Sequence, residues 1–468
     1  MSAYHEFIAT KRKAFTGEGL AHVPSLHDGL FPHQRACVEF SLRAGRSAMF
    51  LDTGLGKSFA SLEWGRVVVE QTNKPVLMLA PLAVGPQHER EAARFGIDAK
   101  YMREPLSSPA PGIWITNYER LPKIDPADYA GVILDESSIL KSFTGKTTRA
   151  LIQSFSGMQW RLACTATPAP NDHTELGTHA EFLGIMRREE MLPRWFINDT
   201  SDTKTWRLKR HAVSDFWRWV ATWARALAQP SDIGFSDEGY DLPSLDVTHH
   251  QVAADRTLSP GEEKRGKEVG QFRLFRIPET SATSIHEEKR LSLPDRADRV
   301  AEVVSAEPDE PWIIWVDTDY EADALAERLP DAREVRGSHT VTAKEMALDA
   351  FAKGQLKQLI TKPRIAGYGL NWQHCARQCF AGLSFSYENY YQAIRRSYRF
   401  GQTRPVHVHV VLSDTEAAIW NVVSRKAGDH DAMKREMQRA MRHEAMRIAP
   451  PAKSLPQSIK IPAWMEHV

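Results

Sequence analysis

A glycine-rich loop between an apolar segment and a helical pattern constrains this chain more than any other feature. The apolar segment ends at Leu51, and the loop follows as Asp52-Thr53-Gly54-Leu55-Gly56-Lys57-Ser58. Glycine permits a tight turn in which several backbone N–H groups point at one centre, and a helix that begins there adds the positive end of its dipole. The stretch predicts a strand, a phosphate-binding loop and a helix, with an ordinary glycine turn as the alternative.

The residues of the loop suit a nucleoside triphosphate. Lys57 would place a point charge on the β- and γ-phosphates, and the Ser58 hydroxyl would ligate magnesium. Upstream, the amide of Gln34 can both donate to and accept from an adenine, although a surface glutamine in a first helical turn is the alternative. We therefore expect ATP to contact the following residues: Gln34, Thr53, Gly54, Leu55, Gly56, Lys57 and Ser58.

Two adjacent carboxylates follow another apolar run. Residues 131–134 are apolar and deliver Asp135 and Glu136 to the end of a predicted strand. Like charges at a buried strand end are costly unless a cation lies beside them. We expect Asp135 to hold magnesium, mostly through water, and Glu136 to polarise an attacking water. The alternative is that Asp135 caps a helix beside a solvated neighbour.

Short apolar runs alternate with helical patterns in both halves of the chain. The predicted strands cover residues 47–51, 75–81, 113–119, 131–135, 161–164, 312–317, 359–362 and 407–411. This alternation predicts an α/β protein with doubly wound parallel sheets. Ligands bind at the carboxyl ends of parallel strands, so Thr116 and Asn117, which end one such strand, could touch a phosphate backbone.

Several segments, in this order, resemble the motifs of helicase superfamily two. They are Gln34, the loop of residues 52–58, Asp135-Glu136-Ser137-Ser138, Thr165-Ala166-Thr167-Pro168 and residues 366–372. Residues 392–402, Gln-Ala-Ile-Arg-Arg-Ser-Tyr-Arg-Phe-Gly-Gln, are similar to the sixth motif of the Swi/Snf-type DNA translocases. The chain departs from these patterns at Ser137-Ser138, at Ala166 and at His88, where tryptophan is usual. The resemblance covers roughly residues 30–185 and 310–425.

The resemblance implies two tandem RecA-like lobes that close on ATP and magnesium. Arg396 and Arg399 would reach the γ-phosphate from the second lobe, and Gln392 would orient them or the attacking water. Gly369 would lie beside the nucleotide, and Arg395 would meet solvent or a phosphate backbone. The residues expected to grip nucleic acid are Pro81, Thr116, Asn117, Lys141 and Asn371.

The expected activity is ATP hydrolysis stimulated by nucleic acid, with translocation on duplex DNA. A strand-separating DNA or RNA helicase is one alternative, and an ATP-dependent switch that remodels a protein is another. The net charge of +1 gives no global field that would attract nucleic acid, although a local groove can still be basic. The four cysteines are scattered, and no apolar run is long enough to span a membrane. We expect a cytoplasmic monomer of bacterial or phage type.

The expected organisation has five parts. They are a lead-in at residues 1–29, an ATP-binding lobe at 30–190, helical protrusions and a linker at 191–295, a second lobe at 296–415, and C-terminal helices with an extended tail at 416–468. The tryptophans between Trp195 and Trp223 have rough helical spacing, which favours core packing over base stacking. In the last part we expect two helices, the second of which carries Met433, Met437 and Met441. We expect this second helix to dock on the first lobe, with contact with DNA as the alternative.

Overall fold

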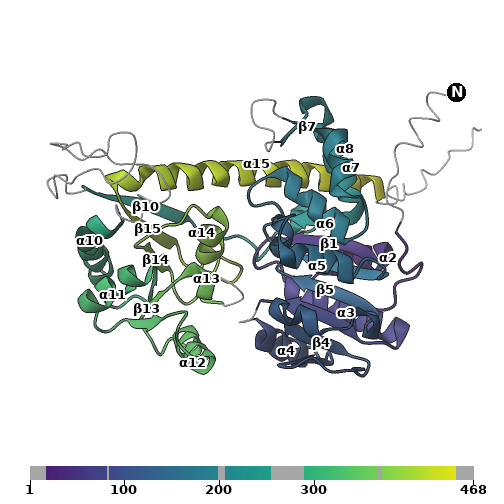
Figure 1. Cartoon of the computed structure of the whole chain (residues 1–468), viewed down its shortest axis with the longest axis horizontal. Helices are drawn as coiled ribbons and strands as arrows, with labels where there is room; N and C mark the ends of the chain where they lie inside the picture. The colour runs from purple at the N-terminus through teal and green to yellow at the C-terminus, as the bar shows by residue number, and fades with distance from the viewer. Residues whose placement is uncertain (1–16, 82–83, 199–205, 254–288, 367–370, 449–468) are drawn as a thin grey trace, which may run out of the picture.

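Two parallel β-sheets with helices on their faces form the chain, as Figure 1 shows. The computed structural model describes residues 17–81, 84–198, 206–253, 289–366 and 371–448. The predicted α/β class and the parallel sheets are confirmed. Among the described residues, no helix has the length and apolar character that a membrane span requires.

The first sheet has seven strands in the order β3-β4-β2-β5-β6-β1-β9. They are β1 (Arg46–Leu51), β2 (Val76–Ala80), β3 (Ala99–Tyr101), β4 (Ile113–Asn117), β5 (Gly131–Asp135), β6 (Trp160–Cys164) and β9 (Ala224–Leu227). Its helices are α2 (Pro32–Ala44), α3 (Lys57–Thr72), α4 (Gly85–Arg94), α5 (Lys146–Ser154), α6 (Leu176–Phe182), α7 (Arg188–Trp195) and α8 (Val213–Trp223). We call this sheet and its helices the N-terminal half. Its central strands are buried on both faces, which explains their continuous apolar sequences.

The second sheet has six strands in the order β10-β15-β14-β11-β13-β12. They are β10 (Leu245–Val252), β11 (Trp312–Trp315), β12 (Arg333–Val335), β13 (Gln358–Thr361), β14 (Arg377–Phe380) and β15 (Val406–Ser413). Its helices are α10 (Leu293–Ser305), α11 (Asp319–Arg328), α12 (Val341–Ala352), α13 (Pro363–Ala366) and α14 (Tyr387–Ile394). We call this sheet and its helices the C-terminal half. Helices α10 and α11 pack on one face of it, and α12 and α14 on the other.

The segment between the two sheets differs in part from the expectation of helical protrusions. The tryptophan-rich helix is present as α8, and its tryptophans are buried as predicted. A short antiparallel hairpin, β7 (Phe196–Asn198) with β8 (Trp206–Leu208), precedes it. However, β9 pairs with β1 and β10 pairs with β15, so this segment also adds one strand to each sheet. β10 lies at a sheet edge and is largely exposed, so it lacks the apolar run by which eight of the strands were predicted. The strands β3, β9, β12 and β14 were not predicted either.

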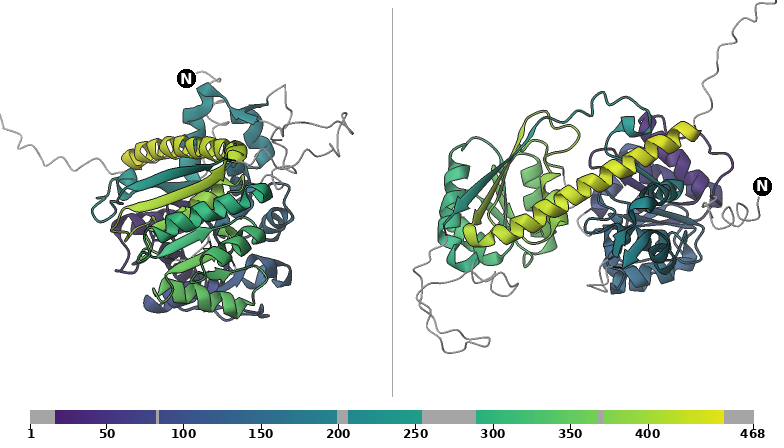
Figure 2. Two further views of the ribbon diagram at one scale, coloured as in Figure 1. Left: turned by 90° about the vertical axis from the view of Figure 1, so that its left-hand side faces the viewer. Right: turned by 90° about the horizontal axis from the view of Figure 1, so that it is seen from above.

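One helix, α15 (Ala417–Ile448), links the two halves. The prediction of two separate helices is wrong, because α15 continues without a break for 32 residues. In Figure 2 it lies across both halves, and in Figure 1 it runs along one side of the molecule. Ile419 and Val423 pack in the core of the C-terminal half, whereas Met433, Met437 and Met441 pack in the core of the N-terminal half. The predicted docking of the methionine stripe is therefore confirmed.

Candidate functional site

The glycine-rich loop has the backbone shape that its sequence predicts. It connects β1 to α3, and both Gly54 and Gly56 have positive φ angles, of 96° and 77°. Within the described residues, the backbone N–H groups of Lys57 and Ser58 have no backbone partner, as expected at a helix N-terminus. The Lys57 ammonium donates to the carbonyl oxygen of Leu51 at 2.7 Å and so lies folded over the loop. Backbone N–H groups at a helix N-terminus, together with a lysine ammonium, suit a phosphate group.

The side chain of Gln34 holds the loop and the start of α2 through two hydrogen bonds. Its amide nitrogen donates to the Leu55 carbonyl oxygen at 3.1 Å, and its amide oxygen accepts from the Phe31 N–H at 3.0 Å. A Cβ atom at Gly56 would lie only 2.0 Å from the Gln34 amide nitrogen, so this contact requires glycine. Both ends of the Gln34 amide are thus engaged with the chain. Each end of the amide can still form a second hydrogen bond, so the expected contact with adenine stays a prediction.

Asp135 and Glu136 lie beside the loop at the end of β5, as expected. The charges of both act on Lys57 and oppose the lowering of its pKa by burial. His88 on α4, which is buried, contacts a carboxylate oxygen of Asp135 at 2.8 Å. Burial opposes ionisation of Asp135, but the charge and hydrogen bond of His88 outweigh it and lower the pKa of Asp135. The same pair raises the pKa of His88 despite its burial.

Glu136 has a different environment. Its φ of 56° lies in the left-handed region, which is unusual for a residue other than glycine and is found often at functional sites. The hydroxyl groups of Thr165 and Ser138 donate to one of its oxygens at 2.6 and 3.2 Å. Burial raises the pKa of Glu136, while Lys57 and Thr165 act in the opposite direction. A carboxylate with a raised pKa suits a group that accepts a proton from water.

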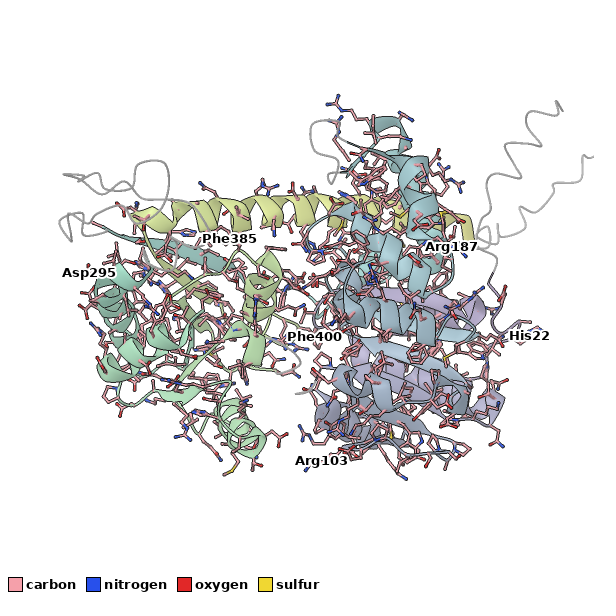
Figure 3. The ribbon with its side chains drawn as sticks, viewed as in Figure 1. His22, Arg103, Arg187, Asp295, Phe385 and Phe400 are labelled. Atoms are coloured by element: carbon pink, nitrogen blue, oxygen red, sulfur yellow. The ribbon has the colours of Figure 1, made fainter. Side chains whose placement is uncertain are left out.

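The C-terminal half reaches this loop through the turn that follows α14. A Cβ atom at Gly54 would lie 2.7 Å from the backbone nitrogen of Phe400, so the two backbones are in close contact. Figure 3 shows Phe400 at the border between the two halves. The neighbouring Arg399 donates to Asn371, and its charge lowers the pKa of Lys57. The structure thus brings Arg399 close to the loop, and burial lowers its own pKa to about 10.

Arg396 has a different position from Arg399. It is almost fully buried, and its guanidinium donates to the backbone oxygen of Gln392 at 3.0 Å and to the side-chain oxygen at 3.2 Å. Gln392 thus orients Arg396, as one of its two expected roles requires. These contacts lie within α14 and the turn after it rather than at the loop.

Arg395 was expected to meet solvent or a phosphate backbone, but it contacts the phosphate-binding loop instead. Its guanidinium donates to a carboxylate oxygen of Asp52, the first residue of the loop, at 2.8 Å. Tyr391 and Lys434 also donate to the Asp52 carboxylate, at 2.5 and 3.0 Å. Burial opposes the charge on Asp52, yet these donors hold its pKa well below its usual range. The prediction for Arg395 is therefore wrong, because it overlooked a buried carboxylate in the opposite half.

Three of the five residues expected to grip nucleic acid are buried or paired with another side chain of the protein. Thr116 is fully buried and donates to the Met102 carbonyl oxygen, and Asn117 is also buried. Lys141 forms an ion pair with Glu388 on α14. The predictions for Thr116 and Asn117 are wrong, because both side chains are buried in the fold. The Lys141 side chain is still 38% exposed, so its contact with nucleic acid stays a prediction. Pro81 and Asn371 are accessible. Gly369 lies outside the described residues.

The structure also brings to the site several residues whose contacts there the sequence patterns did not indicate. They are Asp52, His88, Glu388, Tyr391, Phe400 and Lys434. One signal was available for His88, which stands where the resembled pattern has tryptophan. Asp52 and Phe400 lie inside recognised motifs, but their partners lie more than 300 positions away along the chain. No local pattern reports a contact at that separation.

A cavity of about 470 Å³ lies in the C-terminal half, away from the loop. It is formed where β11, β13 and β14 end, and its lining includes Thr318, Lys362, Arg364, Ser384 and Phe385. The crevice at the carboxyl ends of parallel strands is a common place for ligands. Lys362 is paired with Asp319 at 3.0 Å, whereas Arg364 is exposed. The cavity therefore presents mixed polar and apolar walls with a basic rim.

Comparison with protein families finds a match in the C-terminal half. Residues 295–401 match the Helicase conserved C-terminal domain. The matched range extends from α10 to the turn after α14 and therefore includes Gln392, Arg396 and Arg399. A comparison with curated proteins finds no match. The C-terminal half of this chain is thus similar to the conserved C-terminal domain of helicases.

Proposed function

We propose that the chain is an ATP-dependent nucleic-acid motor, a DNA-stimulated ATPase that translocates on duplex DNA. The observation that carries the proposal is the meeting of two halves at one loop. Lys57, Asp135 and Glu136 come from the N-terminal half, and Arg399 approaches from the half that matches the helicase domain. An ATP site divided in this way can respond to the relative position of two lobes.

The residues fit a triphosphate with magnesium. The two loop glycines adopt positive φ angles that turn the chain tightly before α3, and in the described part of the chain the N–H groups of Lys57 and Ser58 have no backbone partner. Ser58 and Asp135 would hold magnesium, which supplies charge neutralisation on the phosphate oxygens when bound. Glu136 would accept a proton from the attacking water, and Arg399 would stabilise negative charge at the γ-phosphate.

The two halves would act as RecA-like lobes of a motor. The C-terminal half carries the match to the helicase domain, and the N-terminal half carries the phosphate-binding loop on a doubly wound parallel sheet. The preference for duplex DNA rests on the similarity of residues 392–402 to the Swi/Snf-type motif. For nucleic acid we retain Pro81, Lys141 and Asn371. We add the exposed Arg364 at the cavity rim.

A steady-state ATPase assay tests the proposal. The purified chain is assayed alone and with duplex DNA, single-stranded DNA and RNA, at two salt concentrations. We expect duplex DNA to raise kcat most, and we expect salt to weaken the stimulation because phosphate contacts release counterions. No stimulation by any nucleic acid would contradict a motor. Stimulation mainly by single strands or RNA, with separation of forked substrates, would favour the helicase alternative instead.

A further inference from the structure

The carboxylate of Asp52 is held by side chains from two other elements. Tyr391 and Arg395 come from α14 and the residue after it, and Lys434 comes from the middle of α15. The Lys434 ammonium also donates to the Tyr391 hydroxyl at 2.8 Å, so the group forms a closed network. Asp52 itself is 6% exposed. A buried carboxylate with two cations and a phenol is a specific arrangement, since breaking one member leaves an uncompensated buried charge.

Helix α15 is anchored in both halves on either side of Lys434. Before it, Ile419 and Val423 lie in the core of the C-terminal half. After it, Gln438 and Arg442 each donate to the fully buried carboxylate of Asp232 in the N-terminal half, at 3.0 Å. Any change in the relative position of the halves must therefore move α15 against one of them. Because Lys434 donates to Asp52, such a movement would displace the first residue of the loop.

We propose that Lys434 and Tyr391 are positioning residues for the phosphate-binding loop, which act through Asp52, and that α15 thereby couples the position of the C-terminal half to the ATP site. The proposal rests on the ATPase function proposed above. It assigns a role to Lys434, which lies outside the recognised motifs and outside the range that matches the helicase domain.

The geometry gives a direct route from Lys434 to the phosphates. The Asp52 carboxylate accepts from the N–H of Thr53 at 2.7 Å, so its position sets the first turn of the loop. The Lys57 ammonium contacts the carbonyl oxygens of Leu51 and Asp52, at 2.7 and 3.4 Å. A displacement of Asp52 would consequently shift the backbone atoms that hold Lys57. Small misplacements of catalytic groups reduce rates strongly.

The first experiment uses Lys434→Met, which keeps the length of the side chain and removes its charge. In the DNA-stimulated ATPase assay we expect kcat to fall by roughly tenfold or more, with KM for ATP within about threefold, because the loop still binds phosphate but is misplaced for the transition state. Lys434→Arg should recover most of the rate, since it restores the charge. Arg435→Met, at an exposed neighbouring position on the same helix, is the matched control and should retain wild-type kcat.

The second experiment does not depend on ATPase activity. All four native cysteines are buried, so spin labels can be placed at cysteines introduced at the exposed positions Arg103 and Met346, one in each half. We expect Lys434→Met to broaden and shift the distance distribution between the labels, whereas Arg435→Met leaves it unchanged. An unchanged distribution in Lys434→Met overturns the proposal. If wild type shows no ATPase activity the proposed function fails, and the distance measurement alone then decides the coupling. With an active wild type, kcat within twofold in Lys434→Met also overturns it.

Discussion

At the scale of single residues, the site gives different environments to two carboxylates that are neighbours in sequence. Asp135 is paired with His88 and has a lowered pKa, whereas burial raises the pKa of Glu136. Environments that shift the pKa values of two acids apart allow one to remain charged and the other to exchange a proton. This supports Asp135 as the proposed magnesium ligand and Glu136 as the proposed base. Burial and the Arg399 charge lower the pKa of Lys57, which the carboxylates partly offset.

The exchange of Glu136 for glutamine tests this division. Glutamine keeps the shape of the side chain but cannot accept a proton, so we expect ATP to bind normally and kcat to fall by roughly 100-fold or more. The measurements are ATPase turnover and equilibrium binding of a fluorescent ATP analogue. Glu119→Gln, at an exposed position in the same half, is the control and should behave as wild type. Normal turnover in Glu136→Gln would remove Glu136 from the catalytic role.

The sequence predicted those residues whose place depends on local structure. Asp135 and Glu136 follow a buried strand, and the loop lies between a strand and a helix, so their positions follow from the chain nearby. The sequence patterns did not indicate partners that come from the other half. Lys141 was expected at a nucleic-acid surface, and its ion pair with Glu388, which is 247 positions away, was not predicted. The prediction for Thr116 failed for a related reason, because the Met102 segment covers it.

At the scale of elements, most of the strands buried on both faces were predicted correctly, whereas the buried central strand β14 and the exposed edge strand β10 were not. Helix α15 was expected as two helices, with Gly428 near the middle of the segment. Glycine inside a helix costs roughly 1 kcal/mol relative to alanine. That cost is small beside the burial of apolar side chains on both sides of it, each of which contributes about 1.5–3 kcal/mol. Tertiary packing therefore maintains a helix that local propensity would weaken.

His430 on α15 makes this helix sensitive to acid. It is 2% exposed and packs against the rings of Tyr387 and Tyr391, and burial lowers its pKa from 6.5 to about 3. Between these values the unfolded chain binds a proton that the folded chain does not, so stability falls as the pH falls below 6.5. Above pH 6.5 both states are neutral at this position and the effect vanishes.

We expect His430→Phe to remove this loss, because phenylalanine fills a similar space and does not titrate. From pH 6.5 to pH 5 the wild type should lose roughly 2 kcal/mol of unfolding free energy through His430, at 1.4 kcal/mol per pH unit. The measurement is denaturant unfolding of both proteins at several pH values. His22→Phe, at an exposed position, is the control and should follow the wild-type curve. Parallel curves for wild type and His430→Phe would contradict the assignment.

At the scale of the whole molecule, three sets of contacts join the two halves at the proposed ATP site. Phe400 packs on Gly54, the network around Asp52 includes Arg395 and Lys434, and Lys141 pairs with Glu388. Each set ends on or beside α14 or α15, and each begins at the loop or near the Asp135–Glu136 strand end. A change in the relative position of the halves should therefore change the geometry of the site. A motor requires this property, since nucleotide turnover must change how the lobes are placed.

The Lys141–Glu388 pair allows this dependence to be tested by charge exchange. Lys141→Glu places two carboxylates together at a contact where Glu388 is 4% exposed, so the halves should separate locally and Arg399 should lie farther from Lys57. A loss of about 1 kcal/mol, typical of a partly exposed pair, corresponds to a factor of roughly five in the rate. We therefore expect DNA-stimulated ATPase activity to fall about fivefold in Lys141→Glu and to recover when Glu388→Lys is added. Lys146→Glu, a reversal at an exposed position of the same half, controls for net charge and should leave the rate unchanged. Failure of the double variant to recover activity, with both variants folded, would show that Lys141 acts by another route, such as direct contact with nucleic acid.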